Sequence, residues 1–230
     1  MDKSIFVTGT GTDIGKTYIC ALIAKTLKDN GYNCGYYKPV LSGAIQENGK
    51  LIARDCEFVI RTANLKQEAI NSVSYIFKNP VSPHLAANIA NIEIDKNKIL
   101  SDACSKTFEY LIIEGAGGIT CPLKLTPTPY LMSDLIKDLK TNIIIVADAG
   151  LGTINNTLLT VEYAKSHSIK TIGIILNNYI YNNAMYEDNI KTIEALCNTK
   201  VIGLVEKNGK TINTLNYNLI DIFEDKNELV

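Results

Sequence analysis

The sequence has few of the residues that zinc sites and disulfide frameworks require. Histidine occurs twice in 230 residues, and no two of the six cysteines form a Cys-x-x-Cys pair. Structural zinc and dense disulfide networks use closely spaced cysteines or histidines, so both are disfavoured. We expect most of the cysteines to be small, buried, apolar residues. They are Cys20, Cys34, Cys56, Cys104, Cys121 and Cys197.

The sequence also lacks an excess of charge and any long hydrophobic run. Its formal net charge is −1, and no basic block or charged tail is visible. Nucleic acids and anionic membranes select basic patches, so neither is expected as the main partner. No stretch approaches the roughly 18 apolar residues of a membrane span. The short apolar run near the start leads directly into a glycine-rich loop and does not resemble a signal peptide. We therefore expect a cytoplasmic protein.

Buried-strand patterns alternate with amphipathic segments of helical length along the chain. Strands that are buried on both faces give continuous apolar runs, and alternation with helices is typical of a parallel sheet. This pattern predicts an α/β fold with a mostly parallel central sheet flanked by helices, in one domain spanning residues 1–230. Strands are expected at 4–7, 34–40, 110–113, 143–147, 172–176 and 201–205. Helices are expected at 17–30, 54–62, 83–90, 96–106, 154–167 and 185–197. Residues 119–130, with three prolines, are expected to form an irregular loop.

The motif GTGTDIGKT at residues 9–17 follows the first predicted strand and precedes an amphipathic helix. In the usual phosphate-binding loop a glycine lies five residues before the second glycine, but here position 10 is threonine. The nearest upstream glycine, Gly9, lies six residues before Gly15, which is one more than in the usual loop. The context still suits a phosphate loop, because backbone N–H groups and a helix N-terminus favour an anion. Lys16 would reach the terminal phosphates, and the Thr17 hydroxyl would bind Mg²⁺.

Other polar residues are expected at the carboxyl ends of neighbouring strands, where ligands bind in such sheets. A metal on phosphate oxygens usually takes one or two carboxylates as well. Glu114 ends the strand YLIIE, and Asp55 follows the second strand, so both are candidates. Asp148 is a third carboxylate, for which we favour a structural turn role. Lys38, at the end of the second strand, could neutralise charge that develops during phosphoryl transfer.

Several motifs in order resemble the dethiobiotin synthetase family, from residue 5 to about residue 205. They are FVTGTGTDIGKT, GYYKPVLSG, RDCEF, NPVSPHLAA, IIEGAGG, LGTINNTLLT and GIILNN. That family's own loop also has one extra residue between the glycines. The resemblance implies a P-loop NTPase-like fold and an ATP-dependent carbon–nitrogen ligase. Its substrates would be 7,8-diaminononanoate, CO₂ or bicarbonate, and ATP with Mg²⁺, and its product dethiobiotin.

The resemblance also implies a role for each residue that matches the family's motifs. Lys16 and Lys38 would be catalytic, and Thr17, Asp55 and Glu114 would hold Mg²⁺. The substrate would contact Thr12, Lys38, Ser42, Gly118, Leu151 and Asn155, with the last two acting across a homodimer interface. The nucleotide would contact Thr12, Asp13, Ile14, Gly15, Lys16, Thr17, Asp55, Glu114, Gly115, Ala116, Gly117, Asn177 and Asn178.

A few positions depart from the family's pattern. The substrate-tail tyrosine has no clear match, which leaves Tyr181 and Tyr186 as alternatives. None of the departures removes a proposed metal or phosphate group. They are Asp13 for a common glutamate, Asn156 for a histidine, Asn178 for an aspartate and Glu206 for a proline.

Three other classes of protein use related loops. Amidoligases such as CTP synthetase carry a glutaminase domain, for which this chain is too short. Partition-type switch ATPases have a lysine near the start of the loop, where this chain has Thr10 and Gly11. A small GTPase needs lysine and aspartate after Asn177, but Asn178-Tyr179-Ile180 follows. The motifs thus favour the synthetase over these alternatives.

Overall fold

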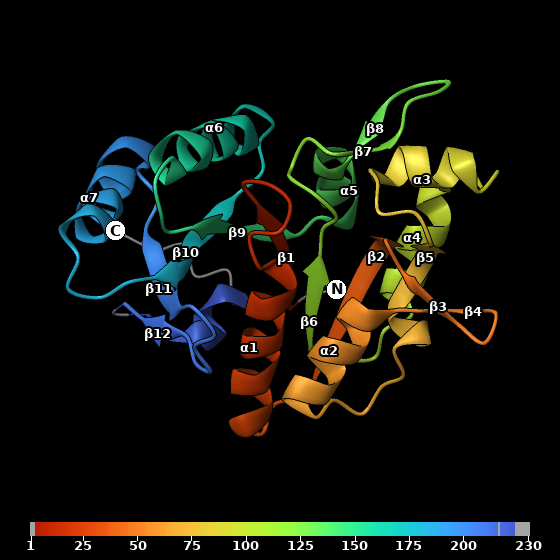
Figure 1. Ribbon diagram of the computed structural model, residues 1–230, viewed down its shortest axis with the longest axis horizontal. Helices are drawn as coiled ribbons and strands as arrows, with labels where there is room; N and C mark the ends of the chain where they lie inside the picture. Colours follow the sequence, from red (N-terminus) through yellow and green to blue (C-terminus); the bar gives the residue numbers. More distant parts are fainter. Residues whose placement is uncertain (1–2, 216, 224–230) are drawn as a thin grey trace.

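The computed structural model describes residues 3–215 and 217–223, and an eight-stranded sheet runs through them (Figure 1). Its strand order is β12-β11-β10-β9-β1-β6-β2-β5. Every pairing is parallel except that of β12 with β11, so the predicted mostly parallel sheet is confirmed. The strands are β1 (Ser4–Gly9), β2 (Cys34–Ser42), β5 (Val73–Phe77), β6 (Tyr110–Glu114), β9 (Asn142–Asp148), β10 (Thr171–Tyr179), β11 (Val201–Glu206) and β12 (Asn213–Thr214). The predicted domain, 1–230, also includes residues outside the described ranges.

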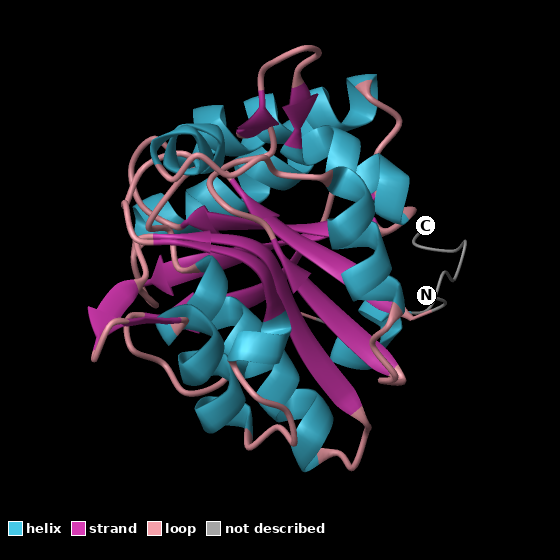
Figure 2. Cartoon of the chain, turned by 90° about the vertical axis from the view of Figure 1, so that its right-hand side faces the viewer, coloured by secondary structure: helices cyan, strands magenta, loops and turns pink. Residues whose placement is uncertain are grey.

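Helices cover both faces of this sheet (Figure 2). One face packs against α1 (Lys16–Asp29), α2 (Arg54–Ala63) and the short η2 (Leu219–Phe223). The other face packs against α3 (Pro83–Ile89), α4 (Lys96–Cys104), α5 (Met132–Leu139), α6 (Thr153–Ser166) and α7 (Ala184–Cys197). Among the described residues, no helix combines the length and the apolar character of a membrane span.

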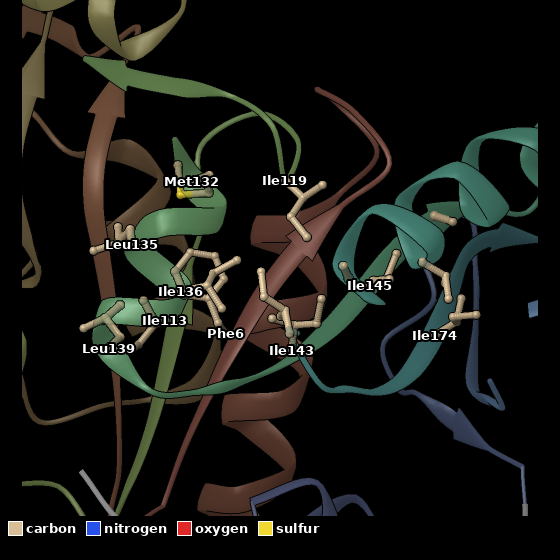
Figure 3. Close-up of a cluster of buried hydrophobic side chains, with 14 of the residues drawn as sticks. Phe6, Ile113, Ile119, Met132, Leu135, Ile136, Leu139, Ile143, Ile145 and Ile174 are labelled. Carbon is tan, nitrogen blue, oxygen red and sulfur yellow. The ribbon is translucent and has the colours of Figure 1, made fainter. Parts of the chain in front are cut away.

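Strand β1 shows why a buried strand gives a continuous run of apolar residues in the sequence. Successive side chains point to opposite faces of a strand, so Ile5 and Val7 join the core under α1 while Phe6 joins the opposite core. In Figure 3 the α5 side chain Ile136 lies close to Phe6. Full burial of one such side chain stabilises the fold by roughly 1.5–3 kcal/mol. A strand with two apolar faces is therefore held in the middle of the sheet.

Several elements were not predicted from the sequence. Edge strand β5 and helix α5 are additional to the expected set, as is the hairpin of β3 (Ile45–Glu47) and β4 (Lys50–Ile52). Expecting only an irregular loop at 119–130 was wrong, because β7 (Pro122–Lys124) pairs with β8 (Tyr130–Leu131). The prolines are compatible with this hairpin, since one begins a strand and the others lie in its turn.

The cysteines mostly follow the expected pattern of buried apolar residues. Four of them, Cys20, Cys34, Cys56 and Cys197, are buried. Cys121 is half-buried and Cys104 is exposed on α4. All six are free thiols.

Candidate active site

The loop between β1 and α1 is fixed by hydrogen bonds to strands β9 and β10. Thr10 N donates to the Val146 carbonyl of β9 (3.0 Å), and Asn177 Nδ2 of β10 donates to the Ile14 carbonyl (3.0 Å). Gly15 precedes the first residue of α1 with a φ of 92°, and a Cβ there would lie 2.2 Å from Asn177 Nδ2. Only glycine suits both the left-handed backbone and this close approach. The loop conformation is therefore set before any ligand binds.

Lys16 begins α1 and is buried under this loop. Its ammonium donates to the Gly11 carbonyl at 2.7 Å, so the side chain folds back along the loop. Burial lowers the pKa of Lys16, although the negative charge of Glu114 opposes that shift. Among the described residues, Lys16 has no carboxylate at ion-pair distance, and a buried cation of this kind is suited to receive an anionic ligand.

Lys38 lies within a strand, which corrects the expectation that it ends one. Strand β2 continues past Pro39 to Ser42 because it changes its pairing partner. Its register with β6 reaches Tyr37↔Ile113, and its pairing with β5 begins at Lys38↔Val73. Lys38 therefore stands beside the end of β6, where Glu114 lies.

An ion-pair network joins Lys38 to two carboxylates from different elements. Its ammonium lies 2.7 Å from Glu114 Oε1 and 2.5 Å from Asp55 Oδ2, at the start of α2. Burial alone would lower the pKa of Lys38, but the charges of Glu114 and Asp55 outweigh it and raise that pKa above its ordinary value. Lys38 therefore remains a cation across the physiological range.

The donors beside the loop suit a hard divalent cation. Thr17 Oγ1 donates to Glu114 Oε1 at 2.7 Å, so one hydrogen-bond network joins this hydroxyl, the carboxylates of Glu114 and Asp55, and the Lys38 ammonium. Within the described ranges, no group of three or more histidine, cysteine or acidic side chains could form an all-protein metal cage. Mg²⁺ does not need such a cage, because it is usually bound by one or two carboxylates, substrate phosphates and water. The residues present therefore fit Mg²⁺.

Most of the predicted site residues line one cavity of about 450 Å³. From that set, the lining includes Thr12, Asp13, Gly15, Lys16, Thr17, Lys38, Ser42, Asp55, Glu114, Gly115, Ala116 and Gly117. Ile14, Gly118, Asn177, Asn178, Leu151 and Asn155 are not part of the lining.

Two lining residues, Tyr18 and Phe58, were missed by the sequence analysis. Their rings stack with centroids 5.9 Å apart, and the Tyr18 hydroxyl donates to the Gly209 carbonyl at 2.8 Å. Each lies within three residues of a predicted ligand, Thr17 or Asp55. That proximity on a helix was the available signal.

The remaining predicted residues lie around this cavity: Asn177 and Asn178 are in β10, Leu151 and Asn155 follow the end of β9, Ile14 is in the loop before α1, and Gly118 is in the loop after β6. Asn178 Nδ2 donates to Asp148 Oδ2 at 2.7 Å, and Gly150 N donates to the other oxygen of the same carboxylate. Asp148 thus stabilises the turn that leads to α6, consistent with the expected turn role. Leu151 is 94% exposed in this turn, and Asn155 is exposed on the first turns of α6.

The fold and the loop define the class of protein, a P-loop NTPase. Residues 3–214 match the family model described as "AAA domain". The MinC:MinD cell division protein complex of Aquifex aeolicus is 14% identical with a TM-score of 0.53, covering 90% of this chain and 82% of that one. A ParA family ATPase from Chlorobium tepidum TLS has the same identity and TM-score, covering 90% and 86%. At such low identity these likenesses support the fold alone.

Relatives with much higher identity define the family. An ATP-dependent dethiobiotin synthetase of Clostridium botulinum (strain Alaska E43 / Type E3) is 48% identical over 204 residues, covering 87% of this chain and 89% of the relative. Another, from the Okra / Type B1 strain, is 43% identical over 234 residues, covering 98% and 100%. The chain belongs to the ATP-dependent dethiobiotin synthetase family, which confirms the resemblance seen in the motifs and disfavours a partition-type ATPase.

Proposed function

We propose that this chain closes the ureido ring of dethiobiotin from 7,8-diaminononanoate, CO₂ and ATP in the cavity between β1, β2, β6 and α2. The observation that carries this proposal is the convergence of Lys16, Lys38, Thr17, Asp55 and Glu114 on one cavity in a member of this family. Two cations beside two carboxylates suit a reaction that gathers anionic phosphates and a carbamate in one place.

The proposed reaction has three steps. One substrate amine adds to CO₂ and loses a proton, which forms a carbamate. A carbamate oxygen then attacks the γ-phosphate of ATP, and ADP leaves. The second amine attacks the carbamate carbon of the resulting anhydride and expels phosphate, which closes the ring. A free carbamate is a poor electrophile, so phosphorylation supplies the leaving group, and the protein mainly positions reactants and neutralises charge.

The two lysines have separate tasks in this proposal. Lys16 leaves the Gly11 carbonyl and pairs with the terminal phosphates of ATP. This gives the buried ammonium an anionic partner. Lys38 turns toward the carbamate and the transferring phosphoryl group while Asp55 and Glu114 keep it protonated. Thr12 and Ser42 contact the carbamate region, and Gly118 contacts another part of the substrate.

We further propose that Thr17, Asp55 and Glu114 hold Mg²⁺ with the phosphates of ATP. Bound there, the ion would neutralise negative charge on the phosphate oxygens. These side chains supply only oxygen donors, which Mg²⁺ prefers. Asp13, Ile14, Gly15, Gly115, Ala116 and Gly117 are proposed to contact the nucleotide beside them.

At the base end of the nucleotide, we propose that Asn177 and Asn178 face the adenine. Asn177 uses its Nδ2 to hold the Ile14 carbonyl, and its Oδ1 can accept a hydrogen bond from the adenine amino group. This would link recognition of the base directly to the shape of the phosphate loop.

We propose a homodimer in which Leu151 and Asn155 of one subunit meet the substrate tail bound by the other. Leu151 is 94% exposed and Leu159 on α6 is 63% exposed, so both leucines are available to pack against a second subunit. The start of α6 also offers backbone N–H groups to the substrate carboxylate. All of these residues belong to one domain, which we propose spans residues 1–230.

Replacing both Leu151 and Leu159 with glutamate is expected to shift the protein from dimer to monomer, because carboxylates without a cationic partner would be buried at the interface. Sedimentation velocity at micromolar concentration measures this change. Ile70→Glu is the matched control, since Ile70 is similarly exposed (56%) on η1 (Ile70–Ser72). A wild-type monomer, or a double variant that stays dimeric, would contradict the proposal.

Turnover is expected to require both diaminononanoate and bicarbonate, because the phosphoryl acceptor is the carbamate that they form. The assay supplies Mg²⁺ and ATP, follows ADP release, and detects dethiobiotin by mass. Omission of either co-substrate should lower ADP release at least about a hundredfold, consistent with loss of a positioned acceptor. Vigorous ATP hydrolysis without them would falsify the proposed reaction.

A further inference from the structure

The two oxygens of the Glu114 carboxylate have different partners. Oε1 accepts from Thr17 Oγ1 and from the Lys38 ammonium, each at 2.7 Å, and so faces the cavity. Oε2 accepts from the Tyr36 hydroxyl at 2.6 Å. Glu114 is 1% exposed, so both oxygens depend on the protein for their hydrogen bonds.

Tyr36 reaches Glu114 because of its position on β2. It lies two residues before Lys38, and the two side chains therefore share one face of the strand. Tyr36 pairs with Ile112 of β6 in the sheet register, two residues before Glu114 on the neighbouring strand. Its side chain is completely buried in the core under α1 and α2, next to the site and outside the cavity lining.

The main chain of Tyr36 is also fixed, by two hydrogen bonds to the side chain of Gln67. Tyr36 N donates to Gln67 Oε1 at 2.9 Å, and Gln67 Nε2 donates to the Tyr36 carbonyl at 2.8 Å. Pairing of β2 with β5 begins only at Lys38, so the Gln67 side chain replaces a neighbouring strand at this residue. With its backbone held on this side and its ring in the core, Tyr36 carries its hydroxyl at a fixed place.

We propose that Tyr36 is a positioning residue that holds Glu114 Oε2 and thereby directs Oε1 toward Thr17 and the metal. This inference rests on the proposed function, in which Glu114 is a Mg²⁺ ligand. The terminal torsion of a glutamate is soft, so a buried carboxylate needs a second contact to fix its plane. Hydrogen-bond partners behind a metal ligand orient it, and their loss typically costs 10- to 100-fold in metal affinity or activity.

The test compares Tyr36→Phe with Tyr37→Phe. Tyr37 is the adjacent residue and also completely buried, but its hydroxyl contacts Ser74 and donates to the Ile99 carbonyl. Each variant keeps the ring and loses one buried hydroxyl, so both are expected to lower the urea midpoint of unfolding. Only Tyr36→Phe is expected to weaken Mn²⁺ binding to the protein–ADP complex, by about tenfold. Electron paramagnetic resonance of free Mn²⁺ measures that affinity without turnover.

Glu114→Gln separates this inference from the proposed function. If Glu114→Gln weakens Mn²⁺ binding but Tyr36→Phe matches Tyr37→Phe, the positioning role is overturned and the metal role stands. If Glu114→Gln leaves the Mn²⁺ affinity unchanged, the metal role of Glu114 fails and the role of Tyr36 fails with it. Selective weakening in Tyr36→Phe, together with a higher Mg²⁺ concentration for half-maximal turnover, supports the inference.

Discussion

Replacing Lys38 with methionine is expected to reduce both catalysis and stability. Methionine keeps most of the apolar stem, so the change mainly removes the charge. Glu114 would then be a buried carboxylate without its cation, and breaking a buried ion pair in this way typically costs 3–5 kcal/mol of unfolding free energy. Loss of a cation at the transferring phosphoryl group is expected to reduce kcat about 10²- to 10³-fold.

Urea denaturation and steady-state kinetics measure these two effects. Protein concentration is held constant, because the apparent stability of the proposed dimer would depend on it. Lys25→Met is the matched control, since Lys25 pairs with Asp29 on the exposed face of α1 and surface pairs contribute little. Normal turnover by Lys38→Met would remove Lys38 from the mechanism, and unchanged unfolding would show that the buried pair does not stabilise the fold.

The convergence of Lys38, Glu114 and the phosphate loop could be predicted without coordinates. In a parallel sheet with helical crossovers, the carboxyl ends of strands meet at one edge, so polar residues there come together whatever their separation in sequence. The continuous apolar runs of β1, β6 and β9 identified the central strands reliably, because only strands covered on both faces need such runs.

Features that depend on tertiary pairing could not be predicted in the same way. Strand β5 is only partly buried, and its sequence gives no continuous apolar run. The predicted second strand ended at residue 40, but the change of partner from β6 to β5 lets β2 continue to Ser42. The link between Tyr36 and Glu114 depends on the register of two strands, which sequence periodicity alone does not specify.

The two lysines of the site respond to burial in opposite ways. Lys16 and Lys38 are 7% and 6% exposed, so their desolvation is similar. Lys38 contacts two carboxylates and its pKa is raised, whereas Lys16 donates to a carbonyl and its pKa is lowered, mainly by burial. The charge of Lys38 is therefore stabilised by its carboxylate partners, whereas the buried charge of Lys16 is destabilised by its surroundings and is suited to pair with an anionic ligand.

Replacing Lys16 with methionine is accordingly expected to abolish turnover while leaving the fold as stable as the wild type or more so. Below its lowered pKa, folded Lys16 bears the full desolvation cost. That cost shrinks as pH rises from the lowered pKa toward the ordinary value of 10.5, so the stability gain should be largest near neutral pH and decline in alkali.

A fall in kcat/KM of about 10³-fold or more is expected, since the variant cannot pair with the terminal phosphates. Urea midpoints at pH 7 and 10, with Lys38→Met measured in parallel, test this contrast. A Lys16→Met protein that loses as much stability as Lys38→Met would show that Lys16 is instead a structural ion-pair partner.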